Sequence, residues 1–485
     1  MENKDLTKRE CDETPSPKKR IFMAHNSCLN SSYDLNLLKA GLEKERYEIV
    51  NQPELADEVI FSGCSVRDVW VNDAVNQINQ IHSRAPGAKI IVTGCIANVS
   101  ADVVVDRSTV RNLHFRSQSE ILKDFTGLDF GKLDREVSQD NLQGYEAATD
   151  SGLSQLRQRI GALKAAVVAS LQEIDREFNV DIEQQYRRTT KGFVFYNEVE
   201  KAELITVSRS CLYKCSFCNI PRGRGAFSSV PLADILAKAE AALARGVRHI
   251  ILVGDEIGNY GMDDVEGRFA DLMKALVELN SEVKISIRYI EPKPFLKNAE
   301  FLRRLCVSGN IELLYVSLQS GSQRILKDMN RNYDISKVAS MYASFRNTTD
   351  TIFYCNWMVG FPGETDDDFQ KTVDLVKTLD LQINVAIPFS ARPGTPAEEF
   401  PNQISEELKA HRVTHLTDVI ADLKVDMFRA LLGFLSKERL EPLLQQIRTA
   451  EVEQYQEPHV RVRPITFHKF VNDEGENSRE PGKGV

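Results

Sequence analysis

The chain has 485 residues, a formal net charge of −9 and nine cysteines. This length predicts two or three domains, each with a hydrophobic core. No apolar run is long enough to cross a bilayer, and the N-terminus lacks the apolar core of a signal peptide, so we expect a cytoplasmic protein that begins with a short disordered arm. The negative charge argues against broad, non-specific nucleic-acid binding. An odd number of cysteines in a long intracellular chain favours metal binding or catalysis over a disulfide framework.

A local basic patch that faces one particular RNA remains compatible with this charge. Its candidate groups are Lys18, Lys19 and Arg20; Arg187, Arg188 and Lys191; and Arg222 with Arg224. For the first two groups the simpler interpretation is solvated surface charge.

Strand-like and helical stretches alternate over residues 20–126, which predicts a doubly wound α/β domain with a parallel sheet. The three predicted strands are Ile21–Ala24, Val59–Phe61 and Ile90–Thr93. Cys28, Cys64 and Cys95 each follow one of these strands. Loops after the carboxyl ends of parallel strands meet at one sheet edge, where ligands bind, so the three thiols could converge. One such cysteine would be an ordinary core residue, but three at equivalent junctions favour a cluster site.

Residues 127–200 predict a linker followed by one long amphipathic helix. The apolar positions recur every three or four residues and are Leu153, Leu156, Ile160, Leu163, Val167, Leu171, Ile174 and Phe178. We expect this helix to pack against a neighbouring domain, and a partner-binding or dimer-forming role is the alternative.

Strand–helix alternation resumes over residues 201–396 and predicts six βα units, an open partial barrel whose functional groups lie in the loops after the strands. The predicted strands are Leu204–Ser208, Ile250–Val253, Lys284–Ile287, Leu313–Ser317, Thr351–Val359 and Gln382–Ile387. Residues 397–471 predict a mainly helical extension with one or two short strands after Pro458, and residues 472–485 predict a disordered tail.

A CxxxCxxC triplet, Cys211, Cys215 and Cys218, directly follows the first barrel strand. Three thiolates can hold three corners of a [4Fe-4S] cluster and leave the fourth iron open to a substrate-like cofactor. The alternative is a zinc site, which needs a fourth ligand at close spacing. No such ligand lies nearby in the sequence. Cys11, Cys306 and Cys355 are interpreted as bystanders.

Several further strings accompany the triplet in order. They are Gly254-Asp255-Glu256 through Gly261, Ile290-Glu291-Pro292, Ser317 through Ser322, Val359 through Glu364, and Ala391 through Pro396. The triplet, the strings and the upstream three-cysteine domain together resemble the radical S-adenosylmethionine (SAM) methylthiotransferase family of the MiaB/RimO type. The resemblance covers residues 20–396, interrupted by the long helix and its linker.

The resemblance implies two [4Fe-4S] clusters, on Cys211, Cys215 and Cys218 and on Cys28, Cys64 and Cys95. It also implies SAM contacts. Phe217 would pack near the adenine, Asp255 and Glu256 would accept hydrogen bonds from the SAM ammonium group, and Gln319 would bind ribose or the methionine moiety. Gly254 and Gly360, which have no side chain, would permit the backbone to approach SAM closely. The simpler interpretations are a core aromatic for Phe217 and a helix-start carboxylate for Glu256.

The implied reaction begins when one electron, from a donor such as flavodoxin or ferredoxin, cleaves SAM to methionine and a 5′-deoxyadenosyl radical. This radical would remove hydrogen from an unactivated C–H bond, the second cluster would carry or donate sulfur, and a second SAM would supply the methyl group. No side chain is identifiable as a general base, so the catalytic residues stay unassigned.

Family members modify the adenosine next to a transfer-RNA anticodon or an aspartate of a ribosomal protein. The strings Gln319–Ser322 and Ala391–Pro396 resemble the RNA-modifying branches, so we expect tRNA as the substrate, with a protein or peptide side chain as the alternative. Those branches usually end in a β-rich TRAM domain, which is not recognisable after Pro396. A hypothesis of another class is a non-catalytic iron–sulfur or zinc protein that binds a partner through the long helix.

Overall fold

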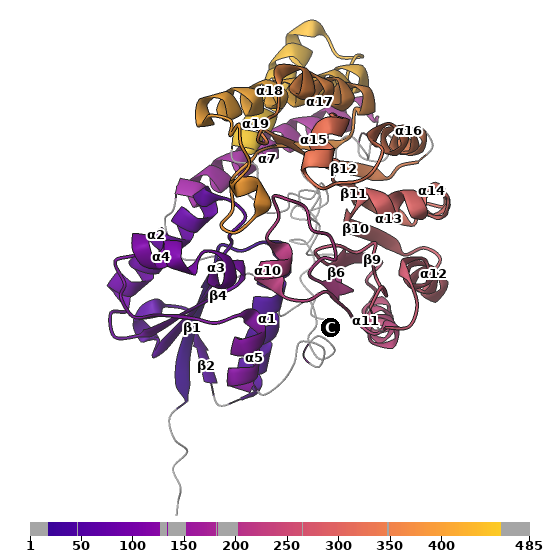
Figure 1. Cartoon of the computed structure of the whole chain (residues 1–485). Helices are drawn as coiled ribbons and strands as arrows, with labels where there is room; N and C mark the ends of the chain where they lie inside the picture. Colours follow the sequence, from indigo (N-terminus) through magenta and orange to yellow (C-terminus); the bar gives the residue numbers. More distant parts are fainter. Residues whose placement is uncertain are drawn as a thin grey trace, which may run out of the picture.

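The structure, a computed structural model, consists of three parts (Figure 1). An N-terminal sheet domain lies beside a second, larger parallel sheet, and a group of long helices covers one end of the latter. The described residues are 18–45, 47–126, 133, 152–180, 182, 202–263, 265–346 and 349–456. The predicted N-terminal arm, the linker before the long helix, the basic group at residues 187–191, the strands after Pro458 and the tail lie outside these ranges.

The N-terminal domain contains a five-stranded parallel sheet in the order β2-β1-β3-β4-β5, which confirms the predicted doubly wound fold. Its strands are β1 (Lys19–His25), β2 (Tyr47–Val50), β3 (Glu58–Ser62), β4 (Lys89–Thr93) and β5 (Leu113–Phe115). Its helices are α1 (Leu29–Lys44), α2 (Asp68–Arg84), α3 (Cys95–Val99), α4 (Ala101–Arg107) and α5 (Gln118–Thr126), with the short helix η1 (Pro53–Leu55). The three predicted strands form its centre. The two edge strands, β2 and β5, escape sequence prediction because they are short and partly exposed.

The second sheet has six parallel strands in the order β13-β12-β11-β10-β9-β6, which confirms the open, partial barrel. Its strands are β6 (Ala202–Thr206), β9 (His249–Val253), β10 (Lys284–Ile290), β11 (Ile311–Val316), β12 (Ile352–Val359) and β13 (Ile383–Pro388). The associated helices are α10 (Ile220–Arg224), α11 (Leu232–Ala244), α12 (Phe269–Leu279), α13 (Pro292–Lys297), α14 (Ala299–Val307), α15 (Gln323–Asp328), α16 (Ile335–Arg346) and α17 (Asp366–Leu379). A two-stranded antiparallel ribbon, β7 (Ser208–Arg209) with β8 (Ser228–Ser229), follows β6.

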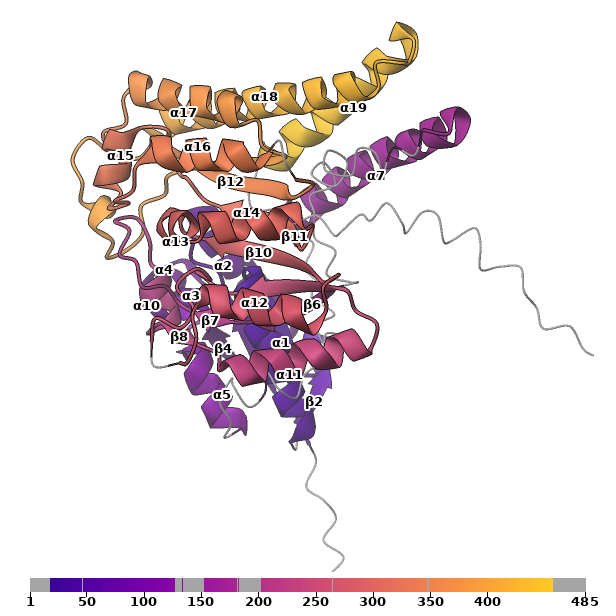
Figure 2. The same cartoon turned by 90° about the vertical axis from the view of Figure 1, so that its right-hand side faces the viewer.

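One hydrophobic cluster joins the two sheets. Leu35, Leu38 and Leu42 of α1 pack in the same buried cluster as Leu204 of β6 and Ile251 of β9. Helix α1 is thereby sandwiched between the N-terminal sheet and the first strands of the barrel, and this contact joins the two domains. Figure 2 shows α1 behind α11 and α12 in this arrangement.

The described part of the C-terminal extension is mainly helical. It comprises η4 (Pro396–Glu398), α18 (Glu406–Leu431) and α19 (Lys437–Gln456), and the long predicted helix forms α7 (Gly152–Phe178). Val167, Val168 and Leu171 of α7 share a buried cluster with Leu444 and Ile447 of α19. The long helix therefore packs on the C-terminal extension (Figures 1 and 2). Among all described helices, none is long and apolar enough to cross a membrane.

Candidate active site

The triplet (Cys211, Cys215 and Cys218) lies on the loop between β7 and α10. Backbone N–H groups point at its sulfurs, because Tyr213 N lies 3.4 Å from Cys211 Sγ and Ile220 N lies 3.4 Å from Cys218 Sγ. Such donors stabilise thiolates and cluster sulfur, which carry negative charge. Burial raises the pKa of the Cys218 thiol to about 12, so the apo protein holds it protonated until a metal replaces the proton.

Two other segments of the barrel clamp the triplet loop. After α15, Met329 O accepts a hydrogen bond from Ser216 N (3.0 Å), and Asn330 Nδ2 donates to Lys214 O (2.7 Å). Beyond the last strand, Pro393 O accepts a hydrogen bond from Asn219 Nδ2 (2.9 Å). The loop after the first strand is therefore fixed across the open mouth of the barrel.

Arg331 brings a buried positive charge to the triplet. Its Nη1 lies 3.9 Å from Cys215 Sγ and 2.8 Å from Glu291 Oε1, and its Nη2 donates to Ser317 O at 2.6 Å. Tyr289 Oη also donates to Glu291 Oε1, at 2.6 Å. The site thus contains a buried, hydrogen-bonded ion pair in contact with one triplet sulfur, and sequence analysis did not assign Arg331 to it.

The second set, the sheet-edge cysteines (Cys28, Cys64 and Cys95), comes from three neighbouring strands. His25 of β1, Ser62 of β3 and Thr93 of β4 are in register, so the residues that follow them meet at one edge. Cys28 caps α1, Cys95 begins α3, and Cys64 N donates to Asn26 Oδ1 at 3.0 Å. Burial raises the pKa of the Cys95 thiol; Arg224 lowers it, and the neighbouring Cys28 and Cys64 raise it, so all three cysteines lie in one electrostatic environment.

The two cysteine sets are adjacent. The residue after Cys218 begins the segment that forms α10, and α10 packs directly on α3. A Cβ atom on Gly223 would lie 3.2 Å from Cys95 Sγ, and Asn98 Nδ2 donates to Gly223 O at 3.0 Å. The interface between the N-terminal domain and the barrel therefore passes between the two sets.

The carboxylates assigned to SAM by sequence are both buried and hydrogen-bonded. Glu256 accepts from the backbone N–H groups of Gly258 (2.8 Å), Asn259 (2.9 Å) and Glu291 (3.3 Å). Burial raises the pKa of Glu256 to about 7 although these donors oppose the shift. Asp255 accepts from Ser210 N, Asn30 Nδ2 and Arg224 Nε, so it lies between the two cysteine sets.

Gln319 has the features of a ligand-binding residue. Its backbone has a φ of +69°, a left-handed conformation that is strained for a non-glycine residue and common at functional sites. Its Nε2 donates to Ser317 Oγ at 2.6 Å, whereas its buried Oε1 accepts no hydrogen bond from any described residue. That oxygen is an available acceptor for a hydroxyl or ammonium group.

Gly254, Gly360 and Phe217 lie at the same end of the barrel. A Cβ atom on Gly254 would lie 2.6 Å from Ser208 Oγ, and one on Gly360, where φ is +73°, would overlap Lys409 Cγ. At both glycines, the space that a side chain would need is therefore occupied by another part of the protein. The Phe217 ring packs edge-on against Phe361, with ring centroids 6.5 Å apart.

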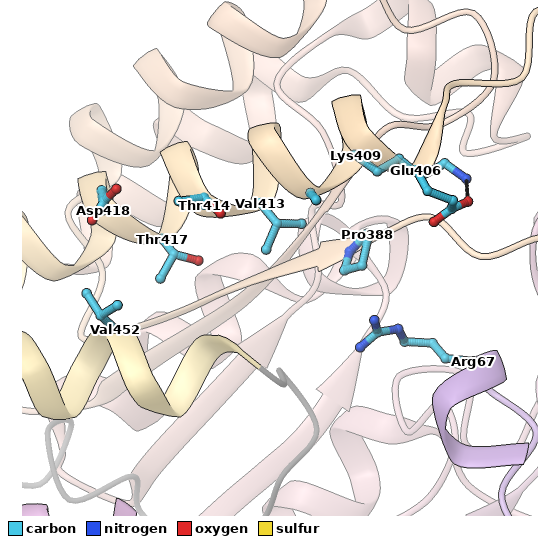
Figure 3. Close-up of a pocket in the computed structure, with 10 residues that line it drawn as sticks. Arg67, Pro388, Glu406, Lys409, Val413, Thr414, Thr417, Asp418 and Val452 are labelled. Carbon is cyan, nitrogen blue, oxygen red and sulfur yellow. Dashed lines mark hydrogen bonds and ion pairs between the residues drawn. The ribbon is translucent and has the colours of Figure 1, made fainter. Parts of the chain in front are cut away.

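A cavity of 340 Å³ lies next to this end of the barrel, between α18, the end of β13 and the start of α2 (Figure 3). Lys409, which contacts Gly360, lines it, as do Arg67, Glu406 and Asp418. The lining mixes both signs of charge, so it favours no single class of ligand.

Two known families match the chain. The radical SAM superfamily matches residues 205–376, and the uncharacterized protein family UPF0004 matches residues 20–115. The solved structure of TsrM, a radical SAM methyltransferase from Kitasatospora setae with cobalamin and a [4Fe-4S] cluster bound, superposes with a TM-score of 0.50 and 13% identity. The superposition covers 78% of this chain and 77% of that one, and supports the fold alone.

Among curated proteins, a tRNA-2-methylthio-N(6)-dimethylallyladenosine synthase of Nitratiruptor sp. is 27% identical over 416 residues, 83% of each chain. The synthase of the same name from Sulfurimonas denitrificans is 26% identical over 441 residues, 88% of this chain and 89% of the relative. The barrel and its cysteine loop define a radical SAM enzyme. With the N-terminal domain and these relatives, the chain belongs to the radical SAM methylthiotransferase family.

This family implies two [4Fe-4S] clusters and SAM as cofactors. The described residues fit them. Within the described ranges, no three His, Cys, Asp or Glu side chains converge tightly enough to bind one metal ion. Ligands of one zinc ion all lie about 2.0–2.3 Å from the same atom and are therefore close to one another. The thiolates of a [4Fe-4S] cluster each bind a different iron and lie farther apart, so the absence of a tight group among the described residues is compatible with a cluster. The N–H donors at the triplet sulfurs and the Arg331 guanidinium match a negatively charged cluster.

Sequence analysis missed two arginines at the site. Arg331 follows α15, a helix too short to give a periodic signal, and only long-range contacts bring it to Cys215. Arg224 is suggested by sequence as part of a basic surface patch, but its side chain is only 6% exposed and is paired with carboxylates. It is therefore unavailable to an RNA. Lys19 and Arg20 are likewise paired, with Glu58 and Asp57.

Proposed function

We propose that this enzyme replaces a C–H hydrogen by a methylthio group on the adenosine next to the anticodon of tRNA. The observation that carries the proposal is the pairing of the triplet with the sheet-edge cysteines at one domain interface, in a chain that aligns over most of its length with tRNA methylthio synthases. One set of cysteines would serve radical generation and the other would hold sulfur.

The chain's own groups have distinct tasks in this proposal. When bound, the clusters and SAM supply the radical, sulfur and methyl chemistry. Cys211, Cys215 and Cys218 hold one cluster, and Cys28, Cys64 and Cys95 hold the other. Gln319 Oε1 accepts a hydrogen bond from SAM, because it is a buried acceptor that no described residue satisfies. Glu256 holds the loop after β9 through backbone N–H groups, and Phe217, Gly254 and Gly360 shape the same end of the barrel.

The charge distribution restricts where RNA phosphates can bind. On the helical extension, Arg429, Arg439 and Arg448 are each paired with carboxylates. Arg222 is exposed on α10, the helix between the two cysteine sets, where its Nη1 donates to Pro393 O at 2.9 Å. Arg222 is therefore a candidate phosphate contact beside the chemistry. A flavodoxin or ferredoxin is the proposed electron donor and the cytoplasm the proposed location.

Nucleoside mass spectrometry of bulk tRNA tests the proposal. The tRNA comes from cells that lack this protein and is incubated with the anaerobically reconstituted enzyme, SAM and a reductant. The expected result is a new methylthio-adenosine species that disappears with the Cys64→Ala and Cys215→Ala variants. If SAM is cleaved while every nucleoside stays unchanged, the tRNA proposal is overturned, and proteins or peptides become the substrates to test.

A further inference from the structure

Arg224 occupies the boundary between the two cysteine sets. Its Nη1 donates to Asp34 Oδ2 and to Gln118 Oε1, both at 2.7 Å, on the N-terminal domain. Its Nε donates to Asp255 Oδ2, at 3.0 Å, on the barrel. The Arg224 guanidinium thus binds both domains at once, and the Arg224 side chain is almost fully buried.

The Asp255 carboxylate extends this connection to the backbone beside both cysteine sets. It accepts a hydrogen bond from Ser210 N (2.8 Å), the residue before Cys211. It also accepts one from Asn30 Nδ2 (3.0 Å), two residues after Cys28. Burial alone would raise the pKa of Asp255, but Arg224 and these donors lower it overall, so the carboxylate is charged.

The charges around Arg224 are balanced and geometrically specific. Asp34 also accepts a hydrogen bond from Arg209 Nε at 3.3 Å, so two arginines face two carboxylates. A buried charge network of this kind adds little to stability over an apolar contact, and its best-attested use is to specify one arrangement of the groups that it joins. The planar guanidinium donates in several fixed directions, which the point charge of a lysine does not reproduce.

We propose that Arg224 is a positioning residue that fixes the triplet and the sheet-edge cysteines relative to each other, so that a substrate activated beside one set meets the sulfur held by the other. This inference rests on the proposed division of work between the two sets, but not on tRNA being the substrate. Its chemical basis is the sensitivity of group transfer to distance, since a misplacement of about 1 Å can cost about a hundredfold in rate.

The test compares Arg224→Lys and Asp34→Asn with Asp68→Asn. Asp68 pairs with Arg392 at 3.0 Å and is a matched control, because this pair also joins the N-terminal domain to the barrel but does not touch the Arg224 network. Three quantities are measured: iron content, the magnetic coupling between the two reduced clusters by electron paramagnetic resonance (EPR), and the methylthio product formed per 5′-deoxyadenosine. In the apo proteins, hydrogen exchange of α1, α3 and α10 reports the same contacts without cofactors.

For Arg224→Lys we expect unchanged iron content and unchanged 5′-deoxyadenosine formation. The magnetic coupling between the clusters should change, and hydrogen exchange in α3 and α10 should be faster. The amount of methylthio product per 5′-deoxyadenosine should fall about tenfold or more. Asp34→Asn should change the same quantities in the same direction, and Asp68→Asn none of them. Unchanged coupling in both test variants overturns the proposal, as does loss of cluster iron from both, which would indicate an assembly role. If even the wild type forms no product on tRNA, the substrate proposal fails while coupling and exchange still test Arg224.

Discussion

The two cysteine sets reach similar chemistry by different structural routes. The triplet occupies one short loop after the first barrel strands, where local N–H groups of Tyr213 and Ile220 point at its sulfurs. The sheet-edge cysteines come from three separate loops and meet only because β1, β3 and β4 are in parallel register. The spacing of the first set is fixed within one loop, which distant barrel segments clamp in place, whereas the spacing of the second set depends on the register of three strands.

The two sets should therefore respond differently to changes elsewhere in the fold. The cysteines of one loop can move together, whereas cysteines on three loops change their spacing when any one of the strands shifts. In both sites a buried arginine lies beside the cysteines, Arg331 at the triplet and Arg224 at the domain interface. We expect substitutions to separate the two sites by their effects on SAM cleavage and on product formation.

The largest expected effect comes from removing one cysteine of each set. Cys215→Ala should abolish 5′-deoxyadenosine formation, whereas Cys64→Ala should retain it within a few-fold and lose only the methylthio product. Each variant should contain about half of the wild-type iron, since each retains one of the two cluster sites. Iron analysis and chromatography of SAM cleavage products measure both quantities. Cys306→Ala, which removes a buried thiol outside both sites, is the control and should keep all the iron.

A smaller effect is expected at Arg331, on the triplet side alone. Arg331→Met removes a guanidinium 3.9 Å from Cys215 Sγ and leaves the buried Glu291 without its cationic partner. We expect a more negative reduction potential for that cluster, because a nearby positive charge favours the reduced state. We also expect a loss of about 3–5 kcal/mol in the free energy of unfolding.

A potentiometric EPR titration and denaturant unfolding measure these two changes at Arg331. The double variant Arg331→Met/Glu291→Gln should recover stability but only part of the potential, since it removes the unpaired negative charge without restoring the cation beside Cys215. A potential that returns to the wild-type value in the double variant would contradict this account.

The smallest expected effect distinguishes two glycines of the loop between β12 and α17. Both have positive φ, +73° at Gly360 and +77° at Gly363, so an alanine at either costs about 1–2 kcal/mol of stability. Only at Gly360 would the added methyl group also displace Lys409, because it would clash with the Lys409 Cγ atom. Calorimetric titration with SAM should therefore show weaker binding for Gly360→Ala than for Gly363→Ala. Equal SAM affinities would argue against a role of Gly360 in the SAM site.

Much of this organisation is predictable from the sequence. The CxxxCxxC spacing identifies the triplet directly, and the strand–helix rhythm places Cys28, Cys64 and Cys95 at one sheet edge. The remaining features depend on contacts between residues far apart in the chain. Arg224 resembles a surface charge in sequence but is buried by Asp34 and Asp255, and nothing in the local sequence of Arg331 indicates its approach to Cys215.

The central claim is that the two cysteine sets hold two clusters with separate tasks. EPR spectra of the reduced Cys64→Ala and Cys215→Ala variants, recorded with and without SAM, test it most directly. Cys64→Ala retains the triplet cluster, so SAM should shift its signal, because an open iron there binds the cofactor. Cys215→Ala retains only the sheet-edge cluster, and its signal should not respond to SAM. A SAM-dependent shift in Cys215→Ala, or none in Cys64→Ala, would contradict the division of tasks.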